Sequence, residues 1–94
     1  GFWIMKTYMW KEIEGYPSWR VQTNDPTIAR KLRRNSKWSI CGFGANTSLW
    51  IYRRSFNTAQ DARKSFRRLA GRIFQKNAST GELSVQTHAN MTPT

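Results

Sequence analysis

Two stretches of the chain share one order of residues, and this repetition constrains the fold more than any other feature. Each places Ala-Arg-Lys five residues after an asparagine and follows it with Arg-Arg, in Asn24 to Arg34 and in Asn57 to Arg68. A tryptophan, an Ile-x-Gly segment with a following aromatic residue, and a second tryptophan precede each stretch in the same order. Self-similarity at a fixed spacing indicates repeated structural units, so we expect a duplication.

Each repeat opens with a pattern typical of a β-hairpin. Residues 19–23 alternate large apolar with polar side chains, and residues 49–56 are rich in β-branched and aromatic side chains, as strands are. Glycine, proline, serine and asparagine interrupt the pattern at residues 15–18 and 42–46, where the chain must reverse. We therefore expect hairpins over residues 2–23 and 37–56.

A helix is predicted after each hairpin. Asp25 is a favourable N-cap and Pro26 suits the first helical position, so the first helix begins there and ends by Asn35. Thr58 and Asp61 are spaced like a capping box at the start of the second helix. One apolar stripe at helical spacing should face the sheet: Ala62, Phe66, Leu69 and Ile73.

The predicted fold is α+β and two-layered. It is a duplicated ββα-ββα arrangement with a four-stranded, largely antiparallel sheet and two helices on one face. We expect one basic domain over residues 1–76, with repeats at about 2–35 and 36–76. Residues 77–94 hold no lysine or arginine and few apolar side chains, which predicts a polar C-terminal tail, and a strand within 81–88 is only weakly indicated.

Charge sets the expected class of partner. The 94 residues carry sixteen Lys and Arg against five Asp and Glu, for a net charge of +11 at pH 7. Such an excess is most easily explained by a polyanion, so we expect nucleic acid as the partner. No apolar run approaches the length that spans a membrane, so no membrane partner is expected.

Few residues can support catalysis or metal binding. One cysteine, Cys41, and one histidine, His88, exclude an internal disulfide, a tetrahedral Cys/His zinc site and a Ser-His-Asp arrangement. The few carboxylates are spread along the sequence, unlike those of a metal-dependent nuclease. We expect no enzyme activity, no catalytic residue, no metal and no cofactor. Sparse cysteine favours a reducing location, the cytoplasm or nucleoid of a cell or of a virus or plasmid host.

The pleat of the sheet predicts two basic surfaces. If the aromatic residues Trp19, Trp50, Tyr52 and Phe56 face the helices, a polar and basic set lies on the open face: Arg20, Gln22, Lys37, Ser39, Ile51 and Arg53. We expect this face to contact bases in a DNA groove. The helices carry the second set, suited to phosphates: Arg30, Lys31, Arg33, Arg34, Arg63, Lys64, Arg67, Arg68 and Arg72.

One segment resembles a known type of DNA-binding domain. Leu49-Trp50-Ile51-Tyr52, followed by Phe56-Asn57-Thr58 and then Ala62 and Phe66, is similar to the last strand and helix of AP2-type and integrase arm-type domains. The resemblance covers residues 49–66. It implies, by analogy, a sheet that lies in the major groove of DNA and contacts bases through exposed Arg and Trp side chains.

Duplex DNA is therefore the predicted ligand, and two alternatives stay open. The first is an RNA or single-strand binder that stacks bases on exposed aromatic residues, with Trp3, Trp10 and Trp38 as candidates, although we expect most of these in the core. The second is a small inhibitor or accessory protein of a virus, plasmid or other mobile element that binds an acidic protein or a nucleoprotein complex.

Overall fold

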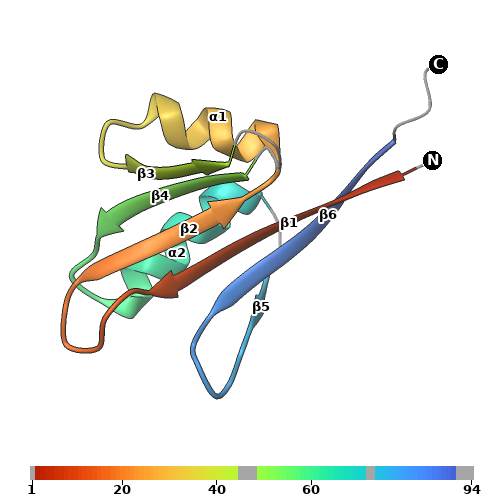
Figure 1. Ribbon diagram of the computed structural model, residues 1–94. Coiled ribbons are helices and arrows are strands. Elements are labelled where there is room, and N and C mark those ends of the chain that lie inside the picture. Colours follow the sequence, from red (N-terminus) through yellow and green to blue (C-terminus); the bar gives the residue numbers. More distant parts are fainter. Residues whose placement is uncertain (1, 45–48, 72–73, 91–94) are drawn as a thin grey trace.

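The computed structural model describes residues 2–44, 49–71 and 74–90, which form six strands and two helices (Figure 1). In chain order these are β1 (Phe2–Lys11), β2 (Ser18–Thr23), α1 (Pro26–Arg34), β3 (Ser39–Gly44), β4 (Leu49–Ser55), α2 (Ala59–Ala70), β5 (Gln75–Lys76) and β6 (Leu83–Asn90). The α+β class and the two predicted hairpins, β1–β2 and β3–β4, each followed by a helix, are confirmed.

The sheet has six strands in the order β3-β4-β2-β1-β6-β5, with every neighbouring pair antiparallel, so the prediction of four strands is wrong. The expected polar tail supplies one of the two additional strands, because β6 pairs with β1 along eight residue pairs, from Phe2↔Asn90 to Met9↔Leu83. The other, β5, lies just before the tail and pairs with β6. Leu83 and Val85 are buried in the core. The two strands continue together past the rest of the sheet toward the chain ends (Figure 1).

The structure does not confirm the duplication. β1 has ten residues and pairs with two neighbours, whereas β3 has six, lies at the sheet edge and carries an irregularity between Ile40 and Gly42. The helices differ too, with nine residues in α1 and twelve in α2. The two ββα segments therefore share an order of residues in the sequence but differ in strand length, helix length and place in the sheet.

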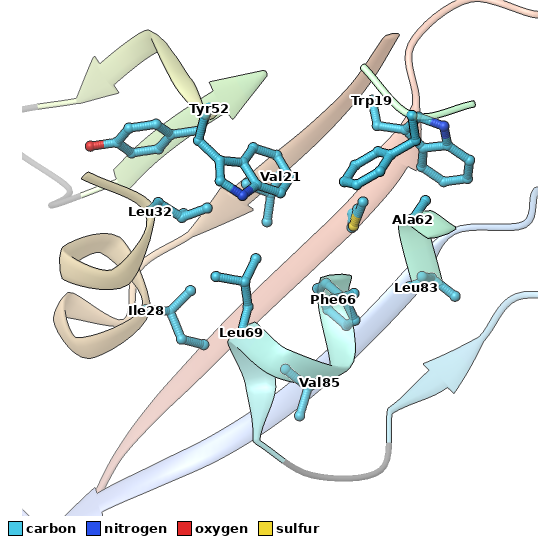
Figure 2. Packing of buried hydrophobic residues seen from close by; sticks show 13 residues of the cluster. Trp19, Val21, Ile28, Leu32, Tyr52, Ala62, Phe66, Leu69, Leu83 and Val85 are labelled. Atoms are coloured by element: carbon cyan, nitrogen blue, oxygen red, sulfur yellow. The ribbon is translucent and has the colours of Figure 1, made fainter. Parts of the chain in front are cut away.

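Both helices cover one face of the sheet, and the core lies between the two layers (Figures 1 and 2). Register places Met9, Val21 and Tyr52 side by side on that face. Phe66 of α2 is fully buried. Of the predicted stripe, Ala62, Phe66 and Leu69 are buried as expected, while Ile73 lies outside the described residues. Trp19, Tyr52 and Phe56 are buried as expected, and Trp50 packs half-buried against them.

The predicted helix boundaries hold. The Asp25 carboxylate accepts a hydrogen bond from the Thr27 backbone N–H at 2.9 Å, Pro26 is the first helical residue, and Asn35 is the C-cap. At α2, the Thr58 hydroxyl accepts the Asp61 backbone N–H at 3.1 Å. Gly71 ends α2 with φ of 68°, a left-handed conformation that glycine adopts without steric cost. Because the caps set where α1 and α2 begin and end, they also set the positions of the helix lysines and arginines relative to the sheet.

Candidate nucleic-acid interface

The face opposite the helices has the composition that the pleat predicted. Two rows of paired residues cross it: Trp10, Arg20, Arg53 and Ser39, then Tyr8, Gln22 and Ile51. Directly paired residues of an antiparallel sheet share a face. The strand residues predicted for the open face therefore do lie together there, and Lys37 lies just before β3 at its margin.

Glu12, which the sequence did not single out, holds both arginines of this face. Its Oε1 lies 2.7 Å from Nη2 and 2.9 Å from Nε of Arg20, and its Oε2 lies 3.3 Å from Nε of Arg53. The Ser18 hydroxyl donates to Oε2 at 2.7 Å. This hydrogen bond and those from Arg20 lower the pKa of Glu12 below its ordinary value. Part of the donor capacity of the arginines expected to contact bases is thus used within the protein.

Two aromatic residues that are not covered by a helix also lie on the open face. Tyr8 and Trp10 alternate on β1 with the core residues Thr7 and Met9, and both are half-buried. They line a hollow of about 480 Å³ together with Lys11, Gln22, Asn77, Thr80 and Glu82. Trp10 is therefore not a core residue, whereas Trp38 is buried as expected, and the side chain of Trp3 lies outside those described.

A second hollow, the helix-side groove, lies between the C-terminal end of α1, α2 and the end of β4. Its volume is about 490 Å³, and its floor includes Trp38, Phe56 and Leu69. Four cations line it: Lys31, Arg54, Lys64 and Arg68. Among the described residues of its lining, Asp61 alone is acidic. The groove therefore gathers positive charge from three separate elements, α1, β4 and α2.

Arg54, absent from the predicted site, is one of the four cations of this groove. Register pairs it with Trp19, on the helix side of the sheet. Its guanidinium carbon lies 4.5 Å from the ring centroid of Phe56 and 5.7 Å from that of Trp38. Burial, and secondarily the charge of Arg68, lowers the pKa of Arg54. Arginine stays charged in proteins even so, and aromatic faces leave its planar edge available for an anion.

The other predicted helix cations divide between different surfaces. Arg30, Arg33 and Arg34 are exposed on α1 and do not line the groove. Arg63 lines a separate hollow near the start of α2 with Lys11 and Lys76. Arg67 lies with its guanidinium carbon 5.8 Å from the Phe74 ring centroid. Arg72 lies outside the described residues. Of the predicted phosphate-binding set, the structure thus brings Lys31, Lys64 and Arg68 together.

A further hollow connects the two faces. Lys37, Ser39, Arg53, Arg54 and Ser55 line it, and Arg54 and Ser55 also line the helix-side groove. Arg53 and Arg54 are successive strand residues, so their side chains project from opposite faces of the sheet. The cations of these two hollows, with Arg20 paired beside Arg53, form a basic belt around the end of β4: Arg20, Arg53, Lys37, Arg54, Lys64, Arg68 and Lys31.

No family model, curated protein or solved structure matches the chain. β4 and α2 do form the strand and helix that the resemblance over residues 49–66 implies, but the sheet has six strands in place of three. Within the described ranges, no group of three His, Cys, Asp or Glu side chains lies together as a metal site. The helices described there are too short or too polar to cross a membrane. The geometry of the basic surfaces is therefore the basis for assigning a function.

Proposed function

We propose that the protein binds nucleic acid, with the sugar-phosphate backbone lying along the basic belt. The supporting observation is the convergence of Lys31, Arg54, Lys64 and Arg68 on one groove. Like charges held together destabilise a protein unless an anion neutralises them, and arginine binds phosphate through short, often bidentate hydrogen bonds. With a net charge of +11, the chain suits a polymer of phosphates better than a single one.

The course of the belt favours a single strand over the duplex that the sequence predicts. Duplex DNA is stiff over about 150 base pairs, so a short site meets one side of a small protein. The belt instead turns from the open face to the helix side around the end of β4. A flexible single-stranded DNA or RNA can follow this turn with its phosphates, as strands do in basic grooves of single-strand binders.

Arg20 and Arg53 have a different role in this proposal from the one expected of them. Glu12 engages both Nε and Nη2 of Arg20 and lies 3.3 Å from Nε of Arg53, so Arg20 has the smaller part of its guanidinium left for a base and Arg53 is held in one orientation. They supply positive charge at one end of the belt, where phosphates of the strand reach the open face. Location in the cell interior, where nucleic acid is found, is part of the same proposal.

Binding to a protein partner is the second candidate, and one observation favours it. Ile40 and Phe43 of β3 are 57% and 56% exposed on a strand at the sheet edge. Exposed apolar residues on an edge strand are typical of contact surfaces. This patch lies apart from the lining of the groove, so an accessory protein of a nucleoprotein complex could use both surfaces.

Charge-removing variants test the proposal. Lys64→Ala with Arg68→Ala removes two groove cations, and Arg30→Ala with Arg33→Ala removes the same charge from the exposed side of α1. Alanine is a good helix former, so both pairs should fold. Binding to a fluorescent single strand is measured by anisotropy at several salt concentrations.

The salt slope is the steepness with which the logarithm of the binding constant falls as the logarithm of the salt concentration rises. Each cation that no longer contacts a phosphate of a single strand lowers this slope by about 0.7. We expect the groove pair to lower it by about 1.4 and the control pair by clearly less. Equal decreases in the two pairs would mean that total charge, and not the groove, determines binding.

A further inference from the structure

The hollow beside Tyr8 and Trp10 differs in chemistry from the helix-side groove. Two aromatic side chains form part of its lining, and its two charged residues, Lys11 and Glu82, are of opposite sign. Gln22, Asn77 and Thr80 add neutral hydrogen-bonding groups. A phosphate would gain little in a hollow with balanced charge. A flat ring with polar edges, by contrast, can stack on the aromatic residues and hydrogen-bond with the neutral groups.

The side of the hollow away from β2 is a fixed turn. The Asn77 Oδ1 accepts the backbone N–H groups of Ser79 and Thr80 at 2.9 and 3.1 Å. The backbone N–H of Asn77 donates to the Glu82 carbonyl at 2.8 Å, and the Glu82 N–H donates to the Thr80 hydroxyl at 3.2 Å. Gly81, with φ of 76°, allows the tight reversal. Asn77, Thr80 and Glu82 therefore stand in set positions opposite the aromatic pair.

The hollow lies within reach of the basic belt. Trp10 pairs with Arg20, which pairs with Arg53, so two strand spacings, about 10 Å, separate Trp10 from Arg53 across the sheet. A single strand whose phosphates follow the belt onto the open face can place a neighbouring base over β1. The three strands involved are central in the sheet, which gives the site a rigid base.

We propose that this hollow binds one unpaired nucleobase, stacked against Tyr8 and Trp10. Because an ionised carboxylate only accepts hydrogen bonds, Glu82 favours a base with an exocyclic amino group (cytosine, adenine or guanine) over thymine or uracil. This inference rests on the proposed binding of single-stranded nucleic acid, since the belt supplies the strand. It adds a base site that phosphate contacts alone do not require.

An oligonucleotide that lacks bases tests the site on the unaltered protein. Oligodeoxycytidine, oligothymidine and an abasic oligomer with the same number of phosphates are titrated with the full chain at several salt concentrations. Stacking of one base corresponds to an affinity change of about 5-fold to about 150-fold. We expect the abasic oligomer to bind more weakly by a factor in that range, with an unchanged salt slope.

The outcomes separate the two proposals. Equal affinity for the abasic oligomer and oligodeoxycytidine would overturn the base site and leave phosphate binding intact. Failure of the protein to bind any of the oligomers would overturn both. Equal affinity for oligodeoxycytidine and oligothymidine would overturn the role given to Glu82. The variant Glu82→Gln tests the same role on the protein side.

Variants locate the site. Trp10→Ala should weaken binding to oligodeoxycytidine by about 5-fold or more, whereas Trp10→Tyr, which keeps an aromatic face, should weaken it much less. Phe43→Ala is the matched control, because Phe43 is an exposed aromatic residue outside the hollow. An effect in Phe43→Ala equal to that in Trp10→Ala would contradict the site. Circular dichroism of each variant confirms that it folds.

Discussion

The guanidinium of Arg54 lies over the ring of Phe56, 4.5 Å from its centroid, and so holds a partly buried positive charge at the floor of a groove. The aromatic face attracts the cation, but Arg68 repels it and burial opposes its charge. We therefore expect Arg54 to contribute more to binding an anion than to folding. Arg54 lies on the helix side of β4, and its neighbour Arg53 lies on the open face. Both line one hollow, so together they link the basic residues of the two faces.

Substitution of Arg54 should therefore affect binding before stability. Arg54→Ala removes one cation from the phosphate path, and we expect the salt slope for a single strand to fall by about 0.7. Arg54→Lys keeps the charge and should keep the slope, while affinity falls because lysine lacks the planar fork. Anisotropy titrations measure both, and wild-type affinity in Arg54→Ala would exclude Arg54 from the interface.

The cluster around Glu12 predicts a pH dependence of stability. Hydrogen bonds from Ser18 and Arg20 lower the pKa of Glu12 in the folded protein. The unfolded chain, with the ordinary value of 4.5, binds the proton more tightly. The stabilisation is therefore present above about pH 4.5 and is lost as pH falls through the lower folded pKa.

Glu12→Gln should be less stable than the wild type at neutral pH, and the difference should shrink as pH falls below 4.5. Urea unfolding at a series of pH values measures it. Glu14→Gln is the control, because Glu14 is exposed in the same turn and should behave as the wild type. A stability difference for Glu12→Gln that stays constant down to acidic pH would contradict the assignment.

Removal of residues 77–94 tests the position of β6. The structure predicts that this truncation unfolds the protein, because β1 loses one of its two partner strands and the core loses Leu83 and Val85. The side chain of Leu83 is 1% exposed, and truncation of a buried leucine to alanine by itself lowers the free energy of unfolding by about 2 to 5 kcal/mol. Circular dichroism decides the matter, since a cooperative melt near that of the full chain would show that the segment is dispensable.

Two phenylalanine substitutions separate the core from the surface. Phe66→Ala should cost about 3 to 5 kcal/mol of unfolding free energy, because Phe66 is 0% exposed between α2 and the sheet. Phe43→Ala should cost far less, because Phe43 is 56% exposed on β3, where its ring packs beside that of Trp50. Denaturant titrations measure both, and equal costs would contradict the packing described.

Local sequence patterns predicted the helices well because caps and apolar spacing are local signals. Asp25, Pro26 and the Ala62, Phe66 and Leu69 stripe act within one element. β6 could not be predicted with the same strength, because Leu83 and Val85 are its two core residues among the side chains described, and its stabilisation comes from pairing with distant β1. The number of strands follows from that long-range pairing, which composition does not specify.

The binding surfaces could be predicted only in part. Strand alternation placed Arg20, Gln22, Ile51 and Arg53 on one face correctly. Alternation in β1 separates Thr7 and Met9 from Tyr8 and Trp10 but does not say which pair meets the helices. Arg54 belongs to the helix side by the same alternation, and its place in a groove depends on where α1 and α2 end. Glu12 joins Arg20 and Arg53 only once three strands are in register.

The most direct measurement is a titration of the unaltered protein with a single strand and with a duplex of the same sequence, at salt concentrations from low to physiological and above. We expect the single strand to bind more tightly at physiological salt, with a slope no steeper than about 5, because the seven belt cations contribute about 0.7 each. Tighter binding of the duplex, or an affinity that does not change with salt, would contradict binding of a single strand along the belt.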